Sequence, residues 1–391
     1  MHNAAVVIGL VLDIDMNILL ICYESPLNPS NGAALRTHHI CRALSSLGTV
    51  RPLVMQPSDH TQLMPPQEPQ EAGRIRFRIP VVPWATAETR KIRRLVAQAA
   101  AAYSFDVVVV RYLPLAMLVD GCLAAPVVVD GDDLDKVDST RAAVPMRWVL
   151  GGLRTLLLRA ITRRAVRRFA HVWYVHPQDM QRFPARSGSL LPNVVDAPES
   201  VLPSASATPV VLMVGRFSYA PNAEGADFFM HEVLPALRTA IAGVRFRLVG
   251  ECRAEQAARW TSVGGVEVAG FVDRLAPEYA AATVVVAPIF SGGGTQIKVL
   301  EALAYARTTV VSAFSAAGFS PTLRHGEHML VARDAGEWTS HCLRLLGSGA
   351  ERDRLGRAGR AEALRSYSAA SMVREVTSTI LRIAAAPVAS H

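Results

Sequence analysis

The chain has 391 residues, a formal net charge of +8 and a hydrophobic content of 50%. This length favours two domains with complete cores, and the basic balance favours an anionic partner or surface. No apolar run reaches the length of a membrane span, and five cysteines without C-x-x-C spacing indicate reduced thiols in a cytoplasmic protein.

The first fifteen residues stand apart from the rest of the chain. They are apolar up to residue 12, but they lack the cationic start and the small-residue cleavage site of a secretory signal. A strand pattern then opens on Met16. Our hypothesis is that Met16 is the natural start and that residues 1–15 are a loosely ordered extension. An intact mass that begins at Met1, for protein made from its native gene, would contradict this hypothesis.

Residues 16–196 alternate between apolar runs and helical patterns. A strand, a polar loop that contains Gly32 and a helix that begins at residue 33 describe the start of a Rossmann-type half. The later apolar runs are short and continuous, as in a parallel sheet that is buried on both faces. We expect strands at residues 16–22, 50–55, 75–80, 106–111, 126–130 and 171–175.

Four aspartates lie at the end of one of these runs, in the segment VVVDGDDLD. Hard cations prefer several carboxylates, so a metal site is one interpretation of the cluster. A helix N-cap and a set of polar groups that faces a ligand are the others. The four residues are Asp130, Asp132, Asp133 and Asp135.

A basic helical pattern runs from residue 146 to residue 169. Seven arginines alternate with apolar side chains along it, and it contains no acidic residue. Such a helix can lie on an anionic membrane with its arginines around a buried apolar face. It can equally pack its apolar stripe on the domain core and leave the arginines in solvent.

The second half follows a stretch rich in Pro, Ser and Ala at residues 197–209, which suits an interdomain linker. A buried strand at 210–214 comes next and ends at Gly215 and Arg216. From there strands and helices alternate in the rhythm of a second doubly wound sheet.

The segment 284–312 carries the most specific pattern of the chain. Its apolar strand ends at Pro288, the turn SGGG follows, and an amphipathic helix begins at Thr295. Successive glycines let a ligand approach the backbone, and a helix N-terminus offers free N–H groups. Lys298 and Glu301 project from neighbouring faces of the first turns, where they suit a diphosphate and a pair of sugar hydroxyls. The plainer interpretation is the strand, turn and helix of any doubly wound sheet, with Glu301 in solvent.

The pattern G-G-G-T-x-I-K-V-L-E-A-L-A resembles the nucleotide-sugar loop of the retaining group 1 glycosyltransferases, which have two Rossmann-like domains (the GT-B fold). The resemblance implies that Glu301 holds the ribose of the donor, while Lys298 and the loop N–H groups hold its diphosphate. Two positions depart from the pattern. Gly293 replaces a glutamate eight residues before Glu301, and Gln296 replaces a basic residue. The loop residues are Gly292, Gly293, Gly294 and Thr295.

The same resemblance assigns the turn after the strand at 210–214. Gly215 and Arg216 would meet the donor diphosphate, and a guanidinium fits this position because its fork can bind two phosphate oxygens. An ion pair at the strand end is the alternative for Arg216.

In the first half, the resemblance places Gly32 and Arg36 near the donor phosphate or the acceptor. An ordinary βα turn is the alternative for this loop. Asp132 and Asp133 would face the acceptor in the cleft between the domains, and the resemblance implies no metal there.

These observations predict an α/β chain with two doubly wound, Rossmann-like domains that face a cleft. The acceptor domain would span residues 16–196, the linker residues 197–209, and the donor domain residues 210–370. As the resemblance implies, the C-terminal helix in residues 371–391 would cross back to the first domain.

The predicted function is the transfer of a sugar, with retention, from a nucleoside diphosphate sugar to an acceptor hydroxyl in polysaccharide, glycolipid or other glycoconjugate biosynthesis. Arg216 and Lys298 would stabilise the departing diphosphate. We expect no metal or other cofactor, no nucleic acid partner, and a cytoplasmic protein that the helix at 146–169 places on the inner face of the membrane. The alternatives are a non-catalytic relative that binds a nucleotide or a partner glycosyltransferase, and a nucleotide-sugar epimerase. An oxidoreductase is disfavoured because no G-x-G-x-x-G stands at a strand-to-helix turn.

Overall fold

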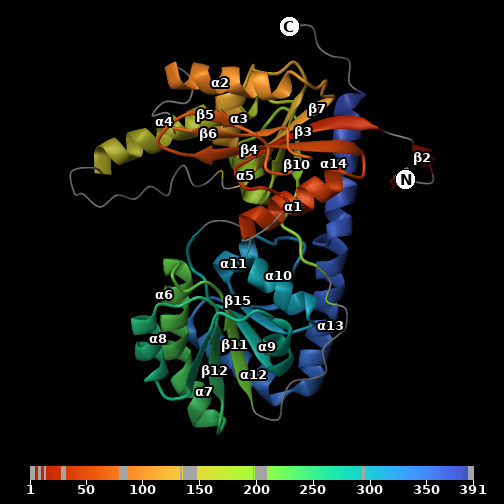
Figure 1. The fold of residues 1–391 in the computed structure, drawn as a ribbon. Coiled ribbons are helices and arrows are strands. Elements are labelled where there is room, and N and C mark those ends of the chain that lie inside the picture. Colours follow the sequence, from red (N-terminus) through yellow and green to blue (C-terminus); the bar gives the residue numbers. More distant parts are fainter. Residues whose placement is uncertain are drawn as a thin grey trace. The chain divides into compact units, whose positions relative to one another are not determined.

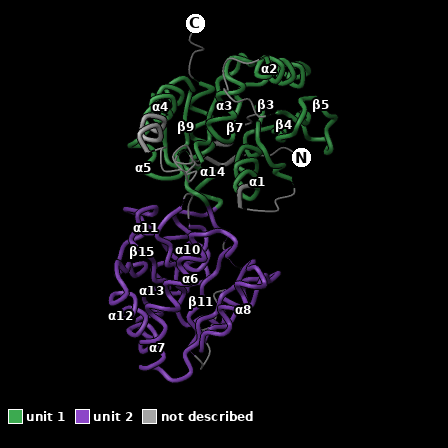
Figure 2. Tube along the Cα trace, turned by 90° about the vertical axis from the view of Figure 1, so that its left-hand side faces the viewer, with its two compact units in different colours: residues 1–193, 369–391 green, residues 194–368 purple. Residues whose placement is uncertain are grey.

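The chain divides into two compact units, each with its own sheet (Figures 1 and 2). Unit 1 comprises residues 1–193 and 369–391, and unit 2 comprises residues 194–368. Both are α/β units built on parallel strands, which confirms the predicted fold class. The computed structural model describes residues 5–7, 10–12, 15–27, 32–78, 87–132, 134, 148–196, 198, 209–292 and 296–385.

Unit 1 contains an eight-stranded sheet in the order β10-β9-β8-β7-β3-β4-β6-β5. All neighbouring strands are parallel except β5 and β6. The central strand β7 is buried at all five residues, as its unbroken apolar run predicts. The strands are β3 (Met16–Cys22), β4 (Gly48–Pro57), β5 (Gln62–Met64), β6 (Gly73–Phe77), β7 (Val107–Arg111), β8 (Val127–Gly131), β9 (His171–Tyr174) and β10 (Gly188–Leu190).

The C-terminal helix α14 (Ala369–Ala384) belongs to unit 1 and lies against α1. Its buried side chains, among them Met372, Val376 and Ile380, recur every four residues, so they form one apolar stripe along the helix. This confirms the predicted return of the last helix to the first half. The other helices of unit 1 are α1 (Gly32–Leu44), α2 (Ala87–Ala100), α3 (Leu113–Val119), α4 (Trp148–Val166) and α5 (Pro177–Arg182).

The N-terminal extension has local structure where it is described. Strands β1 (Ala5–Val7) and β2 (Leu10–Leu12) pair antiparallel in a sheet of their own. The sequence predicted a loosely ordered extension and did not predict this pair of strands.

Unit 2 contains a six-stranded, fully parallel sheet in the order β13-β12-β11-β14-β15-β16. Its strands are β11 (Val210–Val214), β12 (Arg245–Val249), β13 (Val266–Gly270), β14 (Val284–Ala287), β15 (Thr309–Ser312) and β16 (Leu330–Ala332). Its helices are α6 (Ala220–Phe228), a π-helical turn η3 (Phe229–Val233), α7 (Leu234–Ala240), α8 (Ala254–Thr261), α9 (Ala276–Ala281), α10 (Ile297–Ala304), α11 (Ala313–Ala317), α12 (Ala335–Gly347) and α13 (Gly349–Ser366).

Both faces of the unit 2 sheet are covered. Along β11, Val211 and Met213 enter one apolar cluster, while Leu212 and Val214 enter another on the opposite face. Helices therefore pack on both sides, and only the ends of the strands are left for ligands. Among the described helices of either unit, none combines the length and the apolar character that crossing a bilayer requires.

Candidate functional site

The strand order of unit 2 reverses between β11 and β14. From β11 the chain adds β12 and β13 on one side, and then β14, β15 and β16 on the other. Open α/β sheets bind their ligands at such a reversal, outside the carboxyl ends of the strands. The predicted donor residues lie in the loops after these two strands and in α10.

The loop after β11 is held by Asn222, a residue of the first turn of α6. The Asn222 Nδ2 atom donates a hydrogen bond to the Arg216 carbonyl oxygen at 2.8 Å, and the Asn222 side chain is buried. A Cβ atom on Gly215 would lie 3.1 Å from the same nitrogen, so a side chain there would crowd the amide. The Asn222 side chain therefore holds the turn after β11 in place, through its hydrogen bond to Arg216 and its packing against Gly215.

The side chain of Arg216 is exposed and has no hydrogen-bond or ion-pair partner among the described residues. The ion pair considered for it from the sequence is therefore not present in this part of the chain. An exposed guanidinium on a fixed turn can bind two oxygens of a phosphate without first breaking an internal pair.

The loop after β14 meets the loop after β11 at Gly292. This glycine has a φ of +113°, which side-chain-bearing residues rarely adopt. A Cβ atom there would lie 2.6 Å from the Tyr219 hydroxyl oxygen, so glycine permits the two loops to approach. The next predicted residues, Gly293, Gly294 and Thr295, lie outside the described residues.

Lys298 lies in the first turn of α10. Its Nζ atom donates to the Asn222 Oδ1 atom at 2.5 Å, so Asn222 connects the lysine to the Arg216 loop. Burial lowers the pKa of Lys298 to about 8, and the nearby Glu301 carboxylate opposes this change. The ammonium is therefore poorly solvated, and a bound anion would compensate it.

Glu301 lies one turn further along α10. The Tyr279 hydroxyl of α9 donates to its Oε2 atom at 3.4 Å, and Tyr279 stacks on Tyr305 with ring centroids 4.8 Å apart. Burial raises the pKa of Glu301, while the Tyr279 hydrogen bond and the Lys298 charge lower it. The carboxylate thus has a supporting donor and keeps acceptor capacity for hydroxyl groups.

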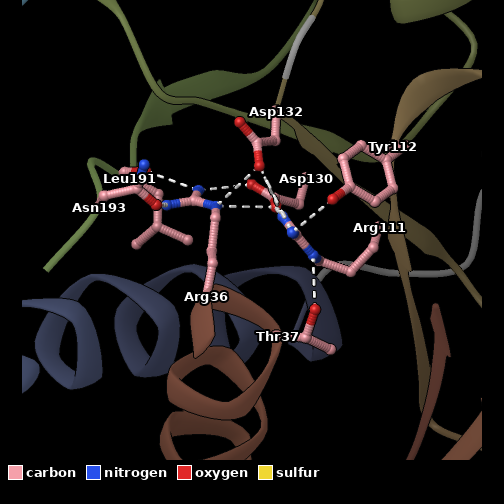
Figure 3. Close-up of polar contacts among 8 residues, drawn as sticks. All are labelled: Arg36, Thr37, Arg111, Tyr112, Asp130, Asp132, Leu191 and Asn193. Atoms are coloured by element: carbon pink, nitrogen blue, oxygen red, sulfur yellow. Dashed lines mark hydrogen bonds and ion pairs between the residues drawn. The ribbon is translucent and has the colours of Figure 1, made fainter. Parts of the chain in front are cut away.

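In unit 1, two arginines enclose one aspartate (Figure 3). Arg36 donates to both carboxylate oxygens of Asp130, at 3.0 and 2.6 Å. Arg111 pairs with Asp130 from the other side and donates to the Thr37 hydroxyl at 3.1 Å. All three charged side chains are at most 3% exposed. Figure 3 shows Asp130 between the two guanidinium groups.

This network changes the interpretation of the predicted acceptor residues. Arg36 also donates to Asn193 and to the Leu191 carbonyl oxygen, so its guanidinium is used inside unit 1 rather than presented to a ligand. Asp132 is half-buried and lies 3.4 Å from Arg111. Gly32 begins α1, and Asp133 lies outside the described residues.

The sequence did not identify Arg111, Asn193, Asn222 or Tyr279 as members of these sites. Arg111 has one local signal, since it is the charged end of the otherwise apolar strand VVVVR. The described residues contain no group of three or more His, Cys, Asp or Glu side chains that could hold a metal ion.

Residues 208–348 match the family model described as glycosyl transferases group 1. The second unit therefore carries a group 1 glycosyltransferase domain. No curated protein matches the chain.

Solved structures show that the glycosyltransferase resemblance extends to the fold of nearly the whole chain. Sucrose-phosphate synthase from Thermosynechococcus elongatus is 17% identical with a TM-score of 0.71, and the match covers 95% of this chain and 100% of that one. HepE from Anabaena, in complex with UDP and glucose, is 14% identical with a TM-score of 0.65, over 94% and 100% of the two chains. A glycosyltransferase from Rickettsia africae is 12% identical with a TM-score of 0.65, over 95% and 100%. The chain has the GT-B fold of these glycosyltransferases.

Proposed function

We propose that this glycosyltransferase moves a sugar from a nucleoside diphosphate sugar to an acceptor hydroxyl with retention. One observation carries the proposal: an exposed guanidinium, a poorly solvated ammonium and a supported carboxylate all stand on the elements that follow β11 and β14, at the strand reversal of unit 2. These are Arg216, Lys298 and Glu301, and Asn222 hydrogen-bonds both the Lys298 ammonium and the backbone carbonyl oxygen of Arg216. Two cations suit a diphosphate, and a carboxylate suits a pair of ribose hydroxyls.

The names of the structural neighbours support this choice of donor. HepE was solved with UDP, with UDP and glucose, and with UDP-glucose. TarM was solved in a complex that includes UDP, and WaaB is a lipopolysaccharide outer core galactosyltransferase. We extend a nucleotide-sugar donor and a glycoconjugate acceptor to this chain as part of the proposal.

The residues of unit 2 would act on the leaving group. During transfer the bond between the sugar C1 and the diphosphate breaks, a bond from C1 to the acceptor oxygen forms on the same face, and the acceptor proton passes to the departing phosphate. Negative charge grows on the diphosphate, and the preorganised charges of Arg216 and Lys298 would stabilise it there. Glu301 would hold the ribose and fix the donor in register. No residue of this chain need act as a nucleophile, and no metal is part of the proposal.

Nucleotide binding should depend on Glu301. We expect one of UDP, GDP, ADP and TDP to raise the melting temperature of the protein by several degrees, since a ligand at 100 times its Kd stabilises by about 2.7 kcal/mol. Glu301→Ala should abolish the shift, while Glu255→Ala, on the exposed face of α8, should retain it. A shift that survives in Glu301→Ala would contradict the ribose role, and no shift with any nucleotide would contradict the proposed function.

The acceptor is proposed to reach the protein at an anionic membrane surface, through α4. Two neighbouring leucines of this helix, Leu156 and Leu157, are 63% and 59% exposed. Arg163 and Arg164 follow them and are also exposed. Apolar side chains beside exposed cations, with no acidic residue in the helix, fit the interface of an anionic bilayer.

Vesicle flotation tests the role of α4. Replacing Arg163 and Arg164 by glutamine should weaken binding to vesicles that contain phosphatidylglycerol by about 2 kcal/mol, since each cation contributes roughly 1 kcal/mol near such a surface. The matched control replaces Arg90 and Lys91, exposed on α2, and should bind like the wild type. Equal binding to neutral phosphatidylcholine vesicles, or equal losses in the two double variants, would refute this surface.

A further inference from the structure

Asn222 contacts both elements that carry the cations of the proposed donor site. It lies in the first turn of α6, it is only 6% exposed, and its backbone N–H donates to the Tyr219 carbonyl oxygen at 3.0 Å. Both ends of its side-chain amide are used. The Nδ2 atom donates to the Arg216 carbonyl oxygen at 2.8 Å, and the Oδ1 atom accepts from the Lys298 Nζ atom at 2.5 Å. One buried side chain therefore links the turn after β11 to the first turn of α10.

Close packing of α6 brings Asn222 to this position. A Cβ atom on Gly225, one turn after Asn222, would lie 2.0 Å from the Pro288 carbonyl oxygen, so the backbone of α6 lies directly against the residue that follows β14. A Cβ atom on Gly215 would lie 3.1 Å from the Asn222 Nδ2 atom. The two glycines let α6 approach both loops, and the space that remains suits a short side chain such as asparagine.

The Lys298 ammonium is held but not used up by this contact. It has three N–H groups, and Asn222 accepts one of them. The other two have no partner among the described residues, so they are available to the oxygens of a ligand. Within this part of the chain, the charged group that acts on Lys298 is Glu301, which favours the ammonium. Tyr279 of α9 donates to Glu301 and stays neutral, because burial raises its pKa.

We infer that Asn222 is a positioning residue for donor binding, which holds the Lys298 ammonium beside the Arg216 turn and leaves its positive charge intact for the diphosphate. An amide oxygen accepts a hydrogen bond from an ammonium without carrying an opposite charge. A carboxylate would hold the ammonium as well but would cancel part of the charge that the diphosphate requires. An aliphatic side chain would leave it unheld in a poorly solvated place. This inference rests on the proposed function and adds to it the residue through which Lys298 acts.

Lysine NMR on the full, ligand-free chain tests the contact. The chain has three lysines, Lys91, Lys136 and Lys298, so lysine labelled with carbon-13 gives three titration curves, and Lys298→Ala identifies one of them. Asn222→Ala should lower the pKa of Lys298 below its wild-type value of about 8, because a hydrogen bond to the charged form is lost. Asn222→Asp should raise this pKa toward the ordinary lysine value of about 10.4. The exposed Lys91 should titrate alike in every variant.

The structural control is Asp227→Ala, on the same helix. Asp227 accepts a hydrogen bond from the Trp260 Nε1 atom at 2.7 Å, so this variant removes a side-chain contact of α6 that does not involve Lys298. It should lower the melting temperature and leave the pKa of Lys298 unchanged. Melting temperatures establish that each variant folds. A pKa of Lys298 that does not fall in Asn222→Ala, or that changes equally in Asp227→Ala, would overturn the contact.

Nucleotide affinity tests the role in donor binding. With the nucleotide found in the thermal-shift screen, Asn222→Ala should raise the Kd about tenfold at pH 7, because the ammonium is no longer held in place. Asn222→Asp should raise the Kd at least as much, although it keeps an acceptor for Lys298. When Lys298 is already alanine, Asn222→Ala should change the Kd less than about threefold, because the residue through which it acts is gone.

Equal losses of affinity with and without Lys298 would overturn the positioning role and leave the donor proposal standing. A wild-type protein that binds none of the nucleotides would refute the donor proposal itself. The lysine titration, which needs no ligand, would then still show whether Asn222 holds Lys298.

Discussion

Replacing Asp130 by asparagine should lower the free energy of unfolding of unit 1 by about 3 to 5 kcal/mol, the usual cost of breaking a buried ion pair from one side. Asp130 is fully buried between Arg36 and Arg111, which are also buried. Without the carboxylate, two cations would face each other in the interior of unit 1. Urea unfolding followed by circular dichroism measures the loss.

The matched control is Asp120→Asn. Asp120 pairs with Arg168 at 2.8 Å, but the Arg168 side chain is 64% exposed, so this pair should contribute less than about 1 kcal/mol. Equal losses in the two variants would contradict the central role of the Asp130 network.

The Asp130 effect should also depend on pH. Burial alone would raise the pKa of Asp130, but the charges of Arg36 and Arg111 outweigh it and hold the pKa below its usual range. For a carboxyl with a depressed pKa, the stabilisation is complete above the unfolded-state pKa of about 3.9 and is lost as the pH falls through the folded-state pKa. The difference between the wild type and Asp130→Asn should therefore be constant near neutral pH and shrink in acid.

Lys298→Ala should reduce kcat by about 30- to 1,000-fold, which corresponds to roughly 2 to 4 kcal/mol of lost transition-state stabilisation. The lysine is held by Asn222 beside the Arg216 loop, where the proposed diphosphate leaves. Release of nucleotide from the donor found in the thermal-shift screen measures the rate. Lys91→Ala, on the exposed face of α2, should retain the wild-type rate. Near-full turnover in Lys298→Ala would contradict the assignment.

The pKa of Lys298 gives this prediction a second readout. Burial lowers it to about 8, so near pH 8 about half of the free protein carries a neutral amine. A bound diphosphate favours the ammonium, so binding at pH 8 should take up protons, and affinity should fall as the pH rises further. The free energy of unfolding of the ligand-free protein should change in the opposite direction to this affinity. It should rise between pH 8 and about 10, because the unfolded lysine holds its proton over that interval. Calorimetry in buffers of different ionisation enthalpy detects the uptake, and Lys298→Ala should show none.

Local sequence determined the elements around the proposed donor site. The apolar runs VVLMV and VVVA became β11 and β14, and the amphipathic segment IKVLEALA became α10. The spacing of apolar residues and the apolar content of a segment are enough to predict such elements, because both are properties of residues that are close together in the sequence. The positions of Arg216 and Lys298 beside those elements followed from the same local rules.

The tertiary structure alone decided how these elements combine. Arg36 was predicted to face a ligand, but its side chain lies in the interior of unit 1. Its partners there are Asp130 of β8 and Asn193, which are 94 and 157 residues away along the chain. The short edge strand β5 lies in a proline-containing stretch and pairs antiparallel with β6. Burial and strand order are properties of the assembled sheet, so a local pattern does not contain them. They place Arg216, Lys298 and Glu301 at the strand reversal of unit 2.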